Sequence, residues 1–349
     1  MTHQHFARLP SSATALVARV VLGACALGLL GAVSAARPAH AEALTKVAVN
    51  GVLVPVSFND GDSFRLQAGH FKGLQSRLSG YNTLESFGSV HQWGTWTEHE
   101  LYVLAKQATL TARRGQWHCE GDGKTDTYGR LLLWCKDLAL TLVGEGLAQV
   151  YSVDDKPGDP DLVLAQDAAM RANKGIWAHG VPRNIMTSLH SKEEGGDKNG
   201  VTSNRLVSTR DGRSSKMLHN DTYKECQKVC AQVPVLADAD IEKALELLKD
   251  DAGVAAAVSA LGKAQLAAAM RVTQEAVARG YPVAAGAWAA PGFAVPAGVS
   301  AAQMDALGAA VKGLLDAGTL TATGTADDSC QIYVDFRRRF GGDRAVCLR

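Results

Sequence analysis

The chain has 349 residues, of which 46% are hydrophobic and 20% are charged, and its formal net charge is +1. This length is enough for two domains, or for one domain with an appendage. The composition is that of a globular protein and excludes disorder throughout the chain. The charge excludes the broad basic excess of many DNA-binding modules, so any affinity for nucleic acid must come from a local site.

Residues 1–41 have the pattern of a signal peptide. Positive charge precedes an apolar stretch from Val20 to Ala35, and a small-x-small cleavage pattern ends at Ala41. The stretch is short for a bilayer span. We therefore expect export, with a mature chain that starts at Glu42 and is secreted or periplasmic.

An alternative for this segment is a lipid anchor at Cys25, because Leu22-Gly23-Ala24-Cys25 resembles a lipobox. The residues after Cys25 stay apolar through Val33, which favours a continuing signal peptide. No later segment is apolar enough to span a membrane, so we expect no stable membrane association. No motif identifies a protein partner.

Six cysteines remain after Cys25. An even number in an exported chain predicts disulfides, here three. A zinc site is the alternative, but the two-residue gaps of zinc knuckles are missing. The six are Cys119, Cys135, Cys226, Cys230, Cys330 and Cys347.

The first part of the chain has a strand-like pattern. Alternating valines predict a strand from Lys46 that a turn at 59–62 interrupts and that resumes to Leu66. A further strand is expected at 77–81, and two more at 116–119 and 130–135, joined by a polar loop.

Helices are expected after these strands. Thr97 and Glu100 have the spacing of a capping box and open the first helix. Apolar patterns predict two more, over 138–151 and 162–174. Short strands with later helices favour an α+β fold, a small β-barrel with packed helices.

The remainder of the chain differs in composition. Residues 181–220 are polar and Gly-containing, which predicts a linker. A C-terminal cysteine-containing region, 221–349, is expected to begin with a helix over 221–230. It carries an Ala-rich helical insert over 232–325, in which Ser300 and Gln303 have capping-box spacing, before a β-patterned tail.

Five short motifs lie in order along 47–177, and each is weak by itself. They are Asp60-Gly61-Asp62-Ser63, Arg77-Leu78-Ser79-Gly80-Tyr81-Asn82-Thr83-Leu84-Glu85, Thr125-Asp126-Thr127-Tyr128-Gly129-Arg130, Gly144-Glu145-Gly146-Leu147-Ala148 and Asn173-Lys174-Gly175-Ile176-Trp177. Their order and spacing resemble the staphylococcal thermonuclease family. The resemblance implies a domain over 42–180 that folds as a five-stranded OB-fold β-barrel with three helices.

The resemblance also implies a function. Members of that family hydrolyse DNA and RNA with the help of calcium and leave 3′-phosphate ends. By resemblance, Asp62 and the Thr83 carbonyl would ligate Ca²⁺, Arg77 and Arg130 would hold the scissile phosphate, and Glu85 would activate water. The chemistry is sound, because a hard cation and two guanidinium groups offset the charge of a phosphodiester transition state.

One position departs from the family pattern. Asn82 stands where the family usually has a second calcium-binding aspartate. An amide oxygen still coordinates calcium but adds no negative charge, so Asn82 predicts weaker binding of the ion. The alternative function is therefore a catalytically impaired module that binds nucleic acid without cutting it.

The cysteines suggest where bridges form. If the strands at 116–119 and 130–135 pair, a Cys119–Cys135 bridge would fasten the loop that leads to Arg130. In the predicted helix, Cys226 and Cys230 lie one turn apart, so each can reach a different cysteine of the tail. The sequence leaves that pairing open.

Overall fold

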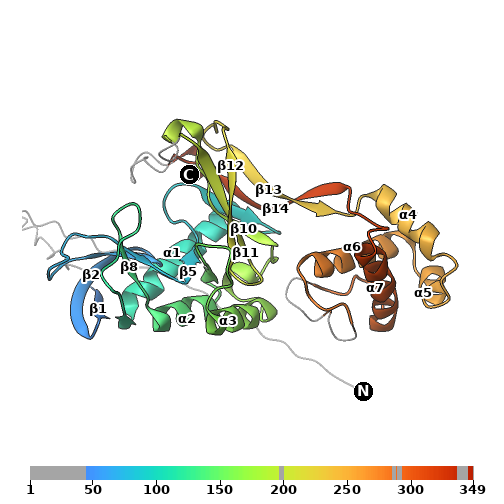
Figure 1. Ribbon diagram of the computed structural model, residues 1–349, viewed down its shortest axis with the longest axis horizontal. Coiled ribbons are helices and arrows are strands. Elements are labelled where there is room, and N and C mark those ends of the chain that lie inside the picture. Colours follow the sequence, from blue (N-terminus) through green and yellow to red (C-terminus); the bar gives the residue numbers. More distant parts are fainter. Residues whose placement is uncertain (1–44, 196–199, 285–287, 289–292, 336–344, 349) are drawn as a thin grey trace, which may run out of the picture. The chain divides into compact units, whose positions relative to one another are not determined.

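The computed structural model describes residues 45–195, 200–284, 288, 293–335 and 345–348 (Figure 1). The predicted signal peptide, with Cys25, lies outside the described residues. Residues Ala43–Arg349 group into one compact unit. The domain limits drawn from the sequence stay predictions.

The N-terminal sheet has four strands in the order β3-β2-β1-β7. Asn50 and Gly51 turn the chain between β1 and β2, with φ angles of 48° and 81°. This left-handed pair is the usual tight hairpin turn. The alternating valines had predicted one continuous strand here. The strands are β1 (Thr45–Val49), β2 (Val52–Asp60), β3 (Ser63–Leu66) and β7 (Trp117–Cys119).

Two short strand pairs lie beside this sheet. They are β4 (Ser76–Leu78) with β8 (Leu131–Leu133), in parallel, and β5 (Tyr81–Thr83) with β9 (Ala148–Val150), antiparallel. The strand expected at 77–81 is thus divided, because Gly80 adopts a φ of 89°. The expected closed five-stranded barrel is not confirmed, because the described strands form separate sheets.

Three helices pack against these strands: α1 (Glu98–Arg114), α2 (Lys136–Gly144) and α3 (Pro160–Arg171). The predicted capping box is confirmed, since the Glu100 N–H donates to Thr97 Oγ1 (3.3 Å) and the Thr97 N–H donates to Glu100 Oε2 (2.9 Å). The helix expected over 138–151 ends at Gly144, and its last residues form β9. The shared core includes Phe58, Phe64, Leu78, Tyr81, Leu138 and Leu142.

The polar linker expected over 181–220 contains a three-stranded antiparallel sheet instead. Its strands, in the order β10-β11-β12, are β10 (Asn184–Ser188), β11 (Thr202–Ser208) and β12 (Ser214–His219). Part of its buried face is polar: Asn204 is buried and donates from Nδ2 to the Tyr223 hydroxyl (3.1 Å). A strand that buries polar groups lacks the apolar alternation that predicts strands, which explains the error.

The helix expected over 221–230 is also wrong. Cys226 has a φ of 64°, and β13 (Lys228–Val235) begins two residues later. This strand pairs with β14 (Gly324–Ile332), which pairs in turn with β6 (Val90–Trp93). The end of the chain is thereby joined to a strand that precedes α1.

Helices occupy the chain between β13 and β14: α4 (Asp238–Leu248), α5 (Ala255–Ala260), α6 (Lys263–Ala278) and α7 (Ala301–Asp316). The Ser300–Gln303 capping box forms, and Gly318 follows α7 with a φ of 67°. Short 3-10 turns lie at Gly175–Trp177, Lys192–Glu194 and Val346–Leu348.

The described residues contain three disulfides: Cys119–Cys135, Cys226–Cys347 and Cys230–Cys330. The first is the predicted bridge. The other two give Cys226 and Cys230 different partners in the tail, although these cysteines flank the start of a strand and lie in no helix. Among the described residues, no helix is long and apolar enough to cross a membrane.

Candidate active site

Asp62 lies at the turn between β2 and β3, and its carboxylate is buried. Its Oδ2 accepts hydrogen bonds from Arg77 Nη1 (2.8 Å) and from the Thr83 N–H (3.0 Å). The backbone fixes the same geometry, because the Leu78 N–H donates to the Asp62 carbonyl (2.9 Å). The structure therefore brings together residues of the first two motifs.

Arg77 and Asn82 extend this network. Arg77 Nη2 donates to Asn82 Oδ1 (2.5 Å), and Asn82 Nδ2 donates to the Thr83 carbonyl (2.7 Å). Although burial alone would lower the pKa of Arg77, the carboxylates of Asp62 and Asp60 raise it. Arg77 is thus a permanent cation held among acidic groups.

Two further acidic residues belong to this region. Burial and the neighbouring Asp62 carboxylate raise the pKa of Asp60 to about 7. Burial, with repulsion from Asp60 and Asp62, raises the pKa of Glu85 to about 8, although Arg77 and Arg130 oppose this shift. A carboxyl group with such a pKa exchanges protons near neutral pH, as a general base requires.

Arg130 is held by a residue of its own motif. Its Nε and Nη2 both donate to Asp126 Oδ2 (2.7 Å each), and Asp126 Oδ1 accepts from the Arg130 N–H (2.9 Å). Arg130 also lines a cleft of about 320 Å³ in which Asp60 takes part. The remaining lining residues are Asn59, Ser63, Gln75, Ser76 and Phe87.

The donor set at Asp62, Asn82 and Thr83 fits calcium in kind, because all three offer hard oxygen ligands. Burial and neighbouring carboxylates raise the pKa of both Asp60 and Glu85 although Arg77 opposes both shifts, which indicates negative charge that a cation would relieve. Of these three expected ligands, only Asp62 carries a formal negative charge. The ligand roles stay predictions.

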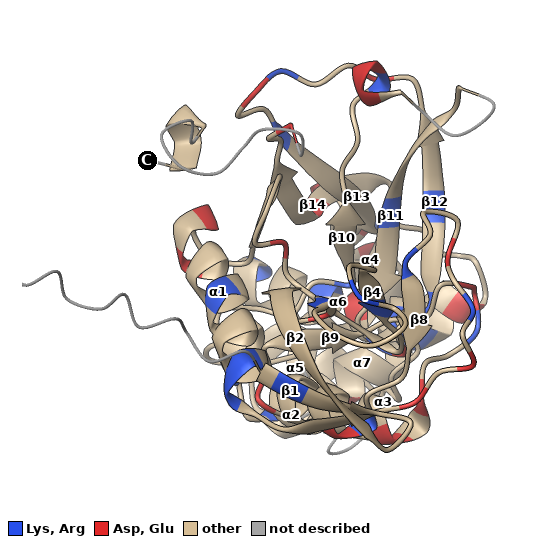
Figure 2. Ribbon diagram, turned by 90° about the vertical axis from the view of Figure 1, so that its left-hand side faces the viewer, with Lys and Arg blue, Asp and Glu red and all other residues tan. Residues whose placement is uncertain are grey.

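Two residues that contact the site arginines were not predicted from the sequence: Asp126, which pairs with Arg130, and Tyr151, which lies beside Arg77. Asp126 could have been found from its place four residues before Arg130. Tyr151, which follows β9, gave no signal: its ring centroid lies 5.6 Å from Arg77 Cζ and 6.0 Å from Arg205 Cζ. Arg205 belongs to β11, where a blue segment marks a basic residue in Figure 2.

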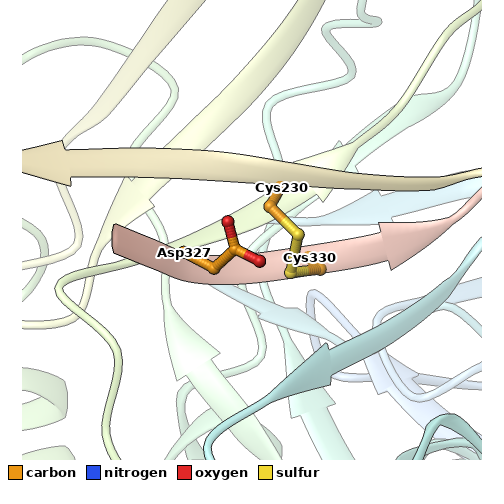
Figure 3. Close-up of side chains that lie close together, drawn as sticks. All are labelled: Cys230, Asp327 and Cys330. Carbon is orange, nitrogen blue, oxygen red and sulfur yellow. A yellow bond between two sulfur atoms is a disulfide. The ribbon is translucent and has the colours of Figure 1, made fainter. Parts of the chain in front are cut away.

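Another group of ligand-type side chains lies outside this region. Cys230, Asp327 and Cys330 approach one another on β13 and β14 (Figure 3). The two sulfur atoms are bonded to each other, so neither is a thiolate available to a metal. This group is a cross-strand disulfide beside an aspartate.

Comparison with known families agrees with the resemblance seen in the motifs. Residues 75–179 match the family model described as staphylococcal nuclease homologue. This part of the chain is a staphylococcal nuclease-like domain. A search of curated proteins finds no match to the chain.

The matched residues include Arg77, Glu85 and Arg130, whereas Asp62 precedes them. A nuclease-like domain suggests a function in cutting or binding nucleic acid, and it is consistent with an OB fold. The sheet β10-β11-β12 and the helices α4–α7 lie beyond the match.

Proposed function

We propose that this chain hydrolyses phosphodiester bonds of DNA or RNA with low sequence specificity, depends on calcium, and acts outside the cytoplasm. One observation carries the proposal. Arg77 binds Asp62 and Asn82 directly, and it lies close enough to Glu85 for their charges to interact.

The residues divide the chemistry among them. Arg77 and Arg130 would donate hydrogen bonds to the non-bridging oxygens of the phosphate and offset the charge that grows there. Glu85 would take a proton from water as the water oxygen bonds to phosphorus. The opposite P–O bond then breaks, and the departing oxygen takes up a proton.

Calcium, held by Asp62, Asn82 and the Thr83 carbonyl, would supply further positive charge at the phosphate. Without the ion the pKa of Glu85 is about 8. A calcium ion nearby would lower that pKa and so increase the share of the basic form of Glu85 at neutral pH.

A second candidate is a module that binds nucleic acid without cutting it. It is favoured by Asn82, which adds no charge to the metal ligands and whose Oδ1 already accepts from Arg77. Under this alternative Arg77 and Arg130 would bind phosphate, and Glu85 would take no part in a reaction.

Three disulfides support a location outside the cytoplasm, where the redox conditions preserve them. The predicted export signal agrees with this location. Whether the mature protein is secreted or periplasmic, the disulfides require the same oxidising conditions.

The test is cleavage of single-stranded DNA by the oxidised mature chain, with calcium and with a chelator. Glu85→Gln should lower the rate by at least about 100-fold, because general-base catalysis contributes that much. Glu120→Gln is the matched control: Glu120 is exposed and lines no part of the cleft around Asp60, so its rate should equal that of wild type.

Failure of the folded protein to cut at any calcium concentration would sink the nuclease proposal and favour the binding module. Asn82→Asp then locates the defect, because a second carboxylate should strengthen calcium binding. Isothermal titration with calcium measures that binding independently of cleavage.

A further inference from the structure

Arg205 lies beyond the nuclease-like match, yet it reaches the candidate active site. Its Cζ is 6.0 Å from the centroid of the Tyr151 ring, and Arg77 Cζ is 5.6 Å from the same centroid. We propose that Arg205 binds the phosphate next to the scissile one in a single-stranded nucleic acid, with Tyr151 as the positioning residue between the two arginines. This inference rests on the proposed function.

The loop between β11 and β12 is hydrogen-bonded to the nuclease-like domain. The Ser152 N–H donates to the Gly212 carbonyl (2.8 Å), and the Gly158 N–H donates to the Asp211 carbonyl (2.8 Å). The buried Gln166 side chain donates to the Thr209 carbonyl (2.6 Å). Arg205 is therefore presented from a fixed sheet, as a preorganised binding group requires.

Arg205 is oriented by neutral acceptors. Its Nη1 donates to the Val153 carbonyl (3.1 Å) and to Ser214 Oγ (2.7 Å). Within the described ranges it forms no salt bridge, and its Nε and Nη2 have no hydrogen-bond partner. By contrast, Arg77, Arg130, Arg183 and Arg213 each pair with a carboxylate.

The neighbouring strand adds a second positive charge. Lys216 on β12 is directly opposite Arg205 in the antiparallel register, and blue segments mark both strands in Figure 2. Residues opposite each other share a face, where like charges destabilise the pair. A bound phosphate would remove that repulsion, and the unused edge of the guanidinium suits its oxygens.

The Tyr151 ring is a shared neighbour of the two arginines. A guanidinium near an aromatic ring is attracted to it, so the Tyr151 ring attracts both Arg77 and Arg205. Arg77 is committed to Asp62 and Asn82, whereas Arg205 offers free donors to a second phosphate. The sheet thus lengthens the nucleic-acid path beyond the domain that the family match covers.

The experiment measures binding without cutting. The oxidised full-length mature chain is titrated into a short fluorescent single-stranded DNA in the presence of a chelator, and anisotropy is followed at several salt concentrations. Arg205→Gln should weaken binding by about tenfold and reduce the slope of log K against log salt by about 0.7, the value for one phosphate contact on a single strand.

Two variants separate charge from structure. Arg205→Lys keeps the charge but loses the forked donors, so it should keep the salt slope while binding more weakly. Arg213→Gln is the matched control, because Arg213 lies just before β12 and pairs with Asp211; its affinity and slope should equal those of wild type. A purely structural role would change affinity without changing the slope.

Wild-type affinity and slope in Arg205→Gln would overturn the proposal, as would a loss of affinity with an unchanged slope. The cleavage assay is separate from this titration. A chain that does not cut, but whose salt slope falls in Arg205→Gln, would refute the nuclease proposal and leave the Arg205 subsite standing.

Discussion

Replacing Glu85 with glutamine should make the folded protein more stable at alkaline pH and leave it unchanged in acid. The pKa of this carboxyl is raised from 4.5 to about 8 in the folded chain, first by burial and then by Asp60 and Asp62. A group with a raised pKa binds its proton more tightly when folded. Its contribution to stability is intact below about pH 4.5 and is lost as the pH rises through about 8.

The size of the effect follows from this difference in pKa. At about 1.4 kcal/mol per pH unit, moving from 4.5 to about 8 corresponds to about 5 kcal/mol at pH 9 and above. Solvent reaches part of the half-buried Glu85 side chain, so we expect half of that value, about 2.5 kcal/mol. Glutamine carries no charge at any pH and keeps nearly the same shape.

The assay is urea unfolding of the oxidised mature chain at pH 5 and pH 9, for wild type and Glu85→Gln. The exposed Glu120→Gln serves as the control and should leave the pH dependence unchanged. A stability difference between wild type and Glu85→Gln that is equal at the two pH values would refute the reasoning. It would mean that the Glu85 charge is fully solvated or fully paired in the folded protein.

Two further changes test the scaffold. Replacing both Cys119 and Cys135 with serine should lower the free energy of unfolding by about 3 kcal/mol, which is the chain-entropy value for a loop of this size. Urea unfolding measures this change, and a decrease below about 1 kcal/mol would contradict the prediction. Thr97→Ala should lower the free energy of unfolding by about 1 kcal/mol, because the Glu100 N–H at the start of α1 loses its capping hydrogen bond. An unchanged melting temperature would show that water replaces the cap.

The C-terminal part of the chain is joined to the nuclease-like domain by strand pairing. Cys330 on β14 is opposite Gln92 on β6, and β6 lies within the matched residues. Cys230 is bonded to Cys330 on the other side of β14. The disulfide therefore links β13 to β14, and β14 in turn pairs with β6 in a three-stranded sheet.

Local signals in the sequence determined several features correctly. The Thr97–Glu100 capping box, the start of α7 at Ser300, and the Cys119–Cys135 bridge depend on residues close in the chain or on strongly patterned elements. The motifs also identified the nuclease-like domain, and four of the five lie within the matched residues 75–179.

Other features of the fold depend on contacts between segments that are far apart in the sequence. Strand β9 was expected to be helical, but pairing with β5 overrides the apolar pattern of its three residues. The sheet β10-β11-β12 buries polar groups such as Asn204, so hydrophobic periodicity does not mark it. The approach of Arg205 to Tyr151 depends on that sheet. Sequence patterns record which residues are apolar or cap a helix, whereas partner strands and neighbouring charges are fixed by contacts between segments far apart in the chain.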